Sequence, residues 1–221
     1  AIVKELVALG TKDLTLIAND MGRAVGPKGE EFFGIAELIH NHQVKRVIAT
    51  HVGMTPEVGQ QNTEGTLEVN LLPQGTLAEC VRAGGAGLGG CLTPTGVGTE
   101  VENGKQKLTI NGKEYLLEMP LHADVSLIKA TKADTAGNLY FHLNSRATNS
   151  TMAFAGDFVI AEVEEIVEVG ELGPEEIHVP APIVDMVYVR TGEKRPLCPM
   201  WQRAKAKAEA KAKEKAEGGN K

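Results

Sequence analysis

Short apolar segments alternate with helical segments through the first third of the chain, and this alternation restricts the fold more than any other feature. Three apolar, β-prone runs predict buried strands, at 14–18, 44–51 and 67–72. Helices are predicted before, between and after them, at 1–9, 34–41, 56–64 and 76–83. Such alternation favours a parallel sheet joined by right-handed crossovers. The sequence therefore predicts an α/β protein with an open, mostly parallel sheet flanked by helices.

The middle of the chain has a different character. Gly, Thr and Pro dominate residues 84–98 and predict a long loop, and a second Gly-rich loop is predicted at 22–33. Asn111-Gly112 separates two β-prone runs, which predicts a tight hairpin over 107–117. Further strands are predicted at 125–130, 139–143, 158–168 and 183–189. The fold thus combines a parallel sheet with a Gly-rich loop and a small β-rich insertion.

The two ends of the sequence differ from its body. Residue 1 already lies in a predicted helix, so we expect a further N-terminal segment ahead of it. Residues 202–217 are almost entirely Ala, Lys and Glu, and they predict a solvated helix. We therefore divide the chain into a domain at 1–201 and a charged tail at 202–221. That tail is either mobile or docked on the acidic surface of a neighbouring subunit.

Charge and cysteine content exclude several classes of protein. The net charge of −6 argues against nucleic-acid binding. The cysteines (Cys80, Cys91 and Cys198) lack the spacing of a metal site, and their odd number suits a reducing compartment. Apolar runs stay shorter than the roughly 18 residues of a membrane span. We therefore expect a cytoplasmic protein without a bound metal ion.

The Gly-rich stretch at 84–98 is the most informative segment for function. Glycines remove side chains, so that backbone N–H groups can face a phosphate, a carboxylate or a thioester oxygen. The stretch lacks the Gly-Lys-Ser/Thr ending of a P-loop, and no long apolar strand precedes it as in a dinucleotide fingerprint. On composition alone, a structural turn and a ligand loop are equally good interpretations.

Two amide side chains follow predicted strands. Asn19 comes after the strand at 14–18, and Gln74 follows the strand at 67–72. The carboxyl ends of parallel strands line the ligand crevice of an open α/β sheet. Two amides at that edge can donate hydrogen bonds to a developing oxyanion. Turn and cap residues are the simpler interpretation of such amides.

Other polar residues give weaker signals. The six histidines, His178 among them, are scattered and are interpreted as surface or turn residues. Ser145 and Ser150 lack the context of a nucleophile elbow. Cys80 and Cys91 lie near the Gly-rich stretch, where a buried thiol is the default interpretation.

The residues at 73–99, PQGTLAECVRAGGAGLGGCLTPTGVGT, closely resemble the α subunit of family I coenzyme A (CoA) transferases. This family includes acetate/acetoacetate, butyrate/acetoacetate and 3-oxoacid CoA-transferases. The resemblance continues in LTLIAND (14–20), RVIATHVG (46–53), ADTAGNLYF (133–141) and EVEEIVEVGELGPEEIHVP (162–180). It covers about residues 1–190 and implies a three-layer α/β/α fold of the CoA-transferase type.

The resemblance implies a mechanism that needs a second chain. In the family, a glutamate of the β subunit, within a Ser-Glu-Asn-Gly motif, attacks the acyl-CoA thioester and forms a glutamyl-CoA intermediate. The present sequence lacks that motif, which implies the α half of an α2β2 or larger assembly. Asn19 and Gln74 match the family's two oxyanion-stabilising amides. CoA is then a substrate, and no tightly bound cofactor is implied.

The resemblance also implies a set of residues that contact substrate or CoA. They follow Gln74 or lie in the Gly-rich stretch: Gly75, Gly84, Gly85, Ala86, Gly87, Gly89, Gly90, Thr95 and Gly96. The sequence departs from the family pattern in three ways: the N-terminal strand and the Gly-Gly-Phe-x-x-x-Gly-x-Pro segment expected ahead of residue 1 are absent, residues 26–33 look like an insertion, and the tail is charged.

Two alternatives stay open at this point. One is a non-catalytic module on the same fold that binds a CoA ester or a sugar phosphate. The other is a subunit that serves assembly alone. The identity of the acid cannot be read from the sequence, because one methylene changes selectivity by only about 1–3 kcal/mol.

Overall fold

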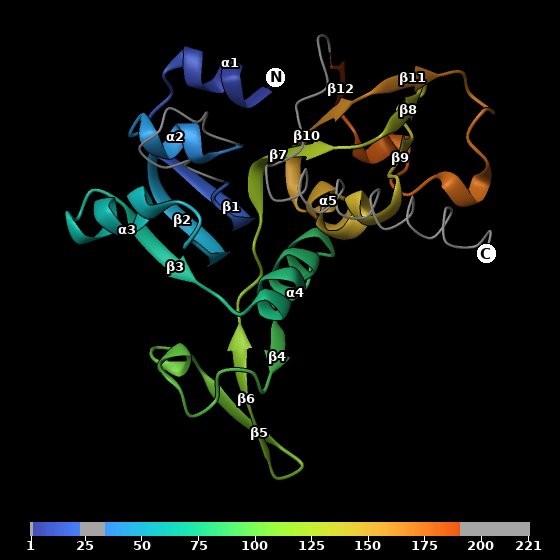
Figure 1. The fold of residues 1–221 in the computed structure, drawn as a ribbon. Helices are drawn as coiled ribbons and strands as arrows, with labels where there is room; N and C mark the ends of the chain where they lie inside the picture. Colours follow the sequence, from blue (N-terminus) through green and yellow to red (C-terminus); the bar gives the residue numbers. More distant parts are fainter. Residues whose placement is uncertain (1, 23–33, 191–221) are drawn as a thin grey trace, which may run out of the picture. The chain divides into compact units, whose positions relative to one another are not determined.

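The computed structural model describes residues 2–22 and 34–190. The predicted loop at 22–33 therefore lies almost wholly outside the described residues, as do the domain boundary at 201 and the helical tail at 202–221. Residues 1–190 belong to one compact unit. Its described part is a mixed α/β structure with parallel sheets, as predicted (Figure 1).

The first parallel sheet has the order β1-β2-β3 and comes from the segment in which strands and helices were predicted to alternate. Its strands are β1 (Leu14–Asp20), β2 (Val44–His51) and β3 (Glu68–Leu71). The helices before and between them are α1 (Ile2–Leu9), α2 (Ala36–His40) and α3 (Pro56–Thr63). Each predicted element in this part is confirmed, with small shifts of its ends. Pairing of Ile17 with Ile48, and of Ile48 with Asn70, fixes the parallel register.

The second parallel sheet has the order β12-β10-β7. It contains β7 (Ala123–Lys129), β10 (Gly156–Val163) and β12 (Met186–Val189). Helix α5 (Arg146–Phe154) leads into β10 and was not predicted. The Ser126 hydroxyl on β7 donates to the Met152 carbonyl at 2.6 Å, which ties α5 to this sheet.

The run at 158–168, predicted as one strand, is divided between two sheets. β10 ends at Val163, and β11 (Glu165–Val167) joins β8 (Lys132–Asp134) and β9 (Leu139–Tyr140) in a sheet of order β11-β8-β9. The break falls at Glu164, whose N–H donates to Thr131 at 3.1 Å. Short 3₁₀ turns complete this region, at Leu143–Ser145, Pro174–Glu176 and Ala181–Ile183.

The β-rich insertion is a small antiparallel sheet of order β4-β6-β5. Its strands are β4 (Cys91–Thr93), β5 (Lys107–Ile110) and β6 (Lys113–Glu118), and a 3₁₀ turn at Glu100–Glu102 lies between the first two. The predicted hairpin is confirmed, because Asn111 and Gly112 both have positive φ, 52° and 76°. Such angles at both central positions suit the turn that best matches strand twist.

Each parallel sheet has its own apolar core. Val47, Leu38 and Ile39 are fully buried in the core beside the first sheet, against which the apolar side of α1 also packs. Phe141 and Val159 are buried in the core of the second. Helix α4 (Gln74–Gly85) follows β3 and packs against α5.

Candidate active site

Several polar groups lie together where the carboxyl ends of the strands of the first sheet meet. Asp20 at the end of β1 lies opposite His51 at the end of β2. The Thr50 hydroxyl donates to the Asn19 carbonyl at 2.7 Å. One strand further, the Leu72 N–H donates to the Ala49 carbonyl at 2.9 Å. Asn19 and the chain that leads to Gln74 therefore leave the sheet at the same edge, as predicted from the strand order.

The Asn19 side chain is half-buried and already has one partner. Its Nδ2 donates to the Thr148 hydroxyl on α5 at 3.3 Å. An amide NH₂ group has two hydrogens, so one donor is left for a ligand. Thr148 was not singled out from the sequence, because nothing in its neighbourhood indicated a helix that reaches Asn19.

Gln74 is the first residue of α4 and is exposed. Within the helix, the Leu77 N–H bonds to the Pro73 carbonyl at 2.9 Å, so the N–H groups of Gln74, Gly75 and Thr76 precede the first intrahelical donor. A helix N-terminus of this kind favours negative charge. Apart from its chain neighbours and the backbone of its own helix, no atom of the described residues lies within 4 Å of a Cβ built on Gly75, so space is open beside this turn.

Gly84 and Gly85 were predicted to belong to a loop, and this assignment is wrong. Both lie in the last turn of α4. A Cβ on Gly84 would overlap the Leu121 carbonyl, and one on Gly85 would lie 2.7 Å from the Phe154 carbonyl oxygen. Eleven residue steps, at about 1.5 Å each, place Gly85 about 16 Å from Gln74 along the helix. Close packing of the backbone thus explains these two glycines, and their contact with CoA stays a prediction.

The next residues end the helix. Ala86 is its C-cap, and Gly87 follows with φ of 68°. The Leu88 N–H donates to the Ala83 carbonyl at 2.9 Å, which is the long bond of a Schellman motif. Gly90 has φ of 143°, and its Cβ would lie 2.6 Å from the Glu118 carbonyl oxygen, whereas the position of Gly89 is open.

Thr95 and Gly96 lie in the turn after β4. The Thr95 N–H donates to the Thr93 hydroxyl at 3.1 Å, and Gly96 has φ of 94°. Nearby, the Gly98 N–H donates to the Glu102 carboxylate at 2.6 Å. That hydrogen bond, followed by one from Lys107, lowers the pKa of Glu102. The geometry of the turn explains why Thr and Gly occur at positions 95 and 96. The binding of CoA by these two residues stays a prediction.

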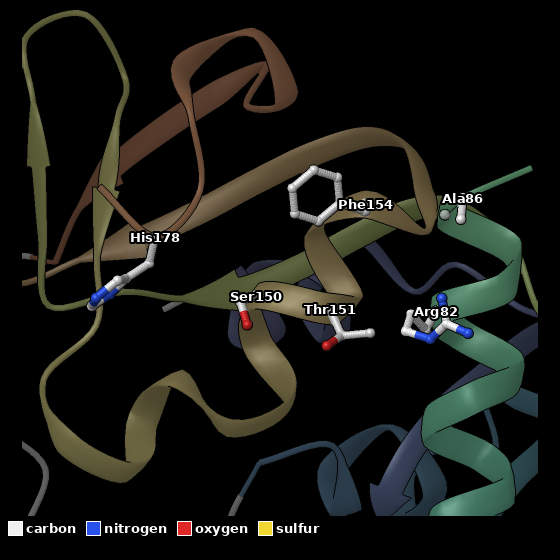
Figure 2. A pocket seen from close by; sticks show the side chains of 7 residues that line it. Arg82, Ala86, Ser150, Thr151, Phe154 and His178 are labelled. Carbon is white, nitrogen blue, oxygen red and sulfur yellow. The ribbon is translucent and has the colours of Figure 1, made fainter. Parts of the chain in front are cut away.

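A cleft of about 370 Å³ lies between α4 and α5 and was missed at the sequence level (Figure 2). Figure 2 shows Arg82 and Ala86 on α4, facing Ser150, Thr151 and Phe154 on α5. Its remaining lining residues are Gly85 and His178. Gly85 and Ala86 are thus the two residues that the cleft shares with the predicted CoA-binding set.

His178 is half-buried and lies in a bend outside the helices and strands, and its ring is held by specific contacts. Its Nδ1 accepts from the Phe141 N–H at 3.1 Å, and its ring stacks on that of Tyr140. Burial, and then the charge of Arg146, lowers the pKa of His178. Ser150 donates to the Arg146 carbonyl at 3.1 Å, so this hydroxyl is engaged within its own helix.

Two kinds of site are not found among residues 2–22 and 34–190. No group of three His, Cys, Asp or Glu side chains there is arranged to hold a metal ion. Within the same residues, no helix is long and apolar enough to cross a membrane.

Comparison with known families gives a match along almost the whole described chain. The sequence profile of coenzyme A transferases matches residues 1–190. The acetate CoA-transferase subunit alpha of Escherichia coli K12 is 48% identical over 193 residues, which are 87% of this chain and 84% of the relative. The acetoacetyl-CoA:acetate/butyrate CoA transferase alpha subunit of Clostridium acetobutylicum is 45% identical over 84% of this chain and 82% of the relative.

Solved structures agree on the fold. An acyl-CoA transferase from Escherichia coli O157:H7 superposes with a TM-score of 0.72 at 23% identity, over 90% of this chain. The present chain spans 42% of that longer chain. Glutaconate coenzyme A-transferase from Acidaminococcus fermentans gives a TM-score of 0.69 at 20% identity, over 86% of this chain and 65% of the other.

Proposed function

Because the chain belongs to the coenzyme A transferase family, we propose that it is the α subunit of a two-subunit enzyme. This enzyme transfers CoA between a short-chain acyl-CoA or 3-oxoacyl-CoA and a carboxylic acid. The observation that carries the proposal is the match over residues 1–190, together with 48% identity to a subunit named for acetate transfer. A relative from Bacillus subtilis, 45% identical, is named for succinyl-CoA and 3-ketoacids, so the choice of acid is left to experiment.

The reaction needs a carboxylate nucleophile, which we assign to a glutamate of the β subunit. Its attack forms a C–O bond to the thioester carbon and breaks the C–S bond, which gives a mixed anhydride and CoA thiolate. The thiolate then attacks the glutamyl carbonyl, forms the glutamyl-CoA thioester and releases the first acid as its carboxylate. The second acid reverses both steps and leaves with CoA. No tightly bound cofactor takes part.

The α subunit contributes donors to the oxygen that becomes negative. Each attack passes through a tetrahedral adduct whose charge concentrates on one oxygen. Asn19, with its second amide hydrogen, and the exposed Gln74 amide both follow strands of the first sheet at the same edge. The N-terminus of α4 at this edge also favours a negative charge. Neutral amides stabilise this charge without a proton transfer. Gly75 and the Gly-rich residues from Gly84 to Gly96 complete the proposed CoA-binding surface.

The assembly and the location belong to the same proposal. Relatives named as alpha or A subunits support a β-subunit partner in an α2β2 or larger complex. Cys80 and Cys91 are free thiols, which suits the cytoplasm. We extend the domain to residue 201 and treat 202–221 as a separate charged tail.

The test is CoA transfer from acetoacetyl-CoA to acetate, measured for the chain alone and after coexpression with its β subunit. We expect activity in the complex and none in the chain alone. In the complex, Gln74→Ala should lower kcat by about 10²–10³ with little change in KM. Gln60→Ala, at an exposed helical glutamine of α3, is the matched control. Tight CoA-ester binding without transfer in the complex would favour a non-catalytic module instead.

A further inference from the structure

Two free thiols lie close together where the small antiparallel sheet packs against α4. Cys80, in the second half of α4, is 1% exposed, and Cys91, the first residue of β4, is half-buried. Residues 81–90 separate them in the chain, and they include the end of α4 and the turn that follows it. Helix α4 and β4 are in contact, so the turn folds the chain back and brings the two cysteines near each other.

The strand register directs Cys91 toward the covered face of the small sheet. Cys91 lies directly opposite Glu118 in the antiparallel pair of β4 and β6. Directly opposite residues of such a pair project from the same face of a sheet. Glu118 is 4% exposed, and Leu116, two positions earlier on β6, is fully buried. The Cys91 side chain therefore shares the buried face of the sheet with these two residues.

Helix α4 places Cys80 at the same face. The Leu121 N–H, just beyond the end of β6, donates to the Cys80 carbonyl at 2.9 Å. The charges of Glu118 and of its ion-pair partner Lys105 both act on the Cys80 thiol. The side chains of Cys80 and Cys91 also share a hydrogen bond. The contact between the thiols thus follows from the register of β4 and from the packing of α4.

The two thiols differ in their access to an oxidant. Burial, and then the neighbouring Cys91, raises the pKa of the Cys80 thiol, so this group stays protonated at neutral pH. A buried and protonated thiol reacts slowly. Cys91 is only half-buried and can be reached from solvent. An accessible cysteine beside a second thiol is the arrangement found at redox-sensitive sites, where the second thiol resolves the oxidised first one.

We propose that Cys80 and Cys91 form a reversible disulfide when the protein meets a hydroperoxide, which makes the pair a modification site. With hydrogen peroxide, the Cys91 sulfur forms an S–O bond while the O–O bond breaks, and the thiol proton leaves in a water molecule. The Cys80 sulfur then attacks the Cys91 sulfur, the S–S bond forms and the S–O bond breaks. The departing hydroxide leaves with the Cys80 proton as a second water. Two thiols thus lose two electrons, and one peroxide is reduced.

The disulfide would close residues 81–90 into a loop. This loop contains most of the predicted CoA-binding residues, and two of them, Gly85 and Ala86, line the cleft between α4 and α5. No described atom beyond their chain neighbours lies within 4 Å of a Cβ built on Gly87 or Gly89. The turn therefore has room to adjust while the two sulfurs approach to about 2.05 Å. Oxidation would restrict this segment, and reduction would release it.

A disulfide of this kind is compatible with a reducing compartment. Disulfides of cytosolic proteins are usually transient, and they serve catalysis or redox sensing. The inference concerns two thiols that the proposed transfer reaction does not use. It holds whether or not the chain takes part in CoA transfer.

The test uses the 221-residue chain with Cys198→Ser, because Cys198 lies outside the described residues. The folded protein is treated with equimolar hydrogen peroxide, and catalase then removes the excess. We expect the intact mass to fall by two hydrogen atoms, and both cysteines to lose iodoacetamide labelling in urea. Trypsin cuts after Arg82, between the cysteines, so a linked pair of peptides identifies the bond. Dithiothreitol should restore both thiols and the original mass.

Two single variants on the same background test the order of the steps. In Cys80→Ser, oxidised Cys91 lacks its partner, so dimedone should trap a sulfenic acid there. In Cys91→Ser, the accessible thiol is removed, and Cys80 should be labelled as fully as in the untreated chain. Cys91→Ser changes a half-buried position, so it keeps the test informative even if the buried Cys80→Ser variant does not fold.

Three outcomes would overturn the proposal. Oxygen added to Cys91, with Cys80 still labelled, would show that the two thiols do not react with each other. A covalent dimer in non-reducing electrophoresis would assign Cys91 to a contact between copies of the chain. Loss of Cys80 labelling in Cys91→Ser would show that Cys80 is oxidised by itself. None of these readouts depends on transferase activity, so a failure here is distinguishable from a failure of the proposed function.

Discussion

The Asn19 Nδ2 and the Thr148 hydroxyl lie 3.3 Å apart, and this hydrogen bond links the end of β1 to α5. It fixes one hydrogen of the amide and thereby directs the other. Thr148 thus acts as a positioning residue for a proposed oxyanion donor. The bond also connects the two halves of the described structure at the edge where chemistry is proposed.

Removal of this hydrogen bond should slow transfer without weakening substrate binding. A single hydrogen bond contributes about 1 kcal/mol, so Thr148→Val should lower kcat of the αβ complex about fivefold and leave KM unchanged. Thr148→Ser keeps the hydroxyl and should retain the rate. Steady-state kinetics of both variants provide the test, and equal rates for Val and Ser would remove Thr148 from the positioning of Asn19.

Gly84 should be intolerant of any side chain. A Cβ there would overlap the Leu121 carbonyl, so α4 or the chain at 121 has to move. We expect Gly84→Ala to reduce the free energy of unfolding by about 1–3 kcal/mol. Gly59 in α3 has open space around it, and Gly59→Ala should stabilise the protein by about 0.5–1 kcal/mol. Urea denaturation of both variants measures the contrast, and a neutral Gly84→Ala would show that packing does not require this glycine.

The ion pair between Lys105 and Glu118 should behave as a buried one. Its atoms are 2.7 Å apart, and the Glu118 side chain is only 5% exposed. Lys105→Met should lower the free energy of unfolding by about 3 kcal/mol, because it leaves a buried carboxylate without its cation. The further change Glu118→Leu should restore most of this stability. Lys132→Met, at a more exposed pair with Glu165, should change stability by less than about 1 kcal/mol. A double variant as unstable as the single one would contradict this explanation.

Asp134 should make the stability of the protein depend on acid pH. Burial acts to raise its pKa, but hydrogen bonds from Asn138, and from the Ala136 N–H, outweigh burial and hold the pKa below the usual value. A carboxyl with a lowered folded pKa stabilises the protein above its unfolded pKa of about 3.9, and this contribution is lost as the pH falls through the folded value.

The measurement is the free energy of unfolding between about pH 3 and about pH 7, a range that begins below the unfolded pKa of about 3.9. Asp134→Asn keeps an oxygen acceptor and lacks the titration, so its stability should fall less steeply at the acid end. Identical slopes for the two proteins would show that Asp134 does not control the acid limb.

The first sheet and the hairpin could be predicted because their signals are local. Apolar runs of strand length and the Asn111-Gly112 pair carry the information within a few residues. Helix α5 could not, because Thr148, Ser150 and Thr151 are weak helix formers. The bond from Ser126 to Met152 and the packing of α4 hold this helix, and both partners are distant in sequence.

The candidate site shows the same division. The shared edge of Asn19 and Gln74 follows from strand order alone, and the structure places both there. By contrast, Gly84 and Gly85 looked like loop residues because composition cannot reveal that Leu121 and Phe154 approach α4 so closely. The break at Glu164 could not be predicted either. The alternating pattern continues through this residue, although the strands on its two sides pair with different partners.

The pairing of the strands also sets an order in which the protein acquires structure. Ile110 pairs with Lys113 across the hairpin turn, a closure that takes microseconds. Leu14 pairs with Val44, and the whole first sheet is encoded before residue 72. A ribosome therefore releases everything this sheet needs while the second sheet is still unsynthesised. The two sheets can form as separate folding units, so a slow-translating stretch between them would favour an orderly assembly.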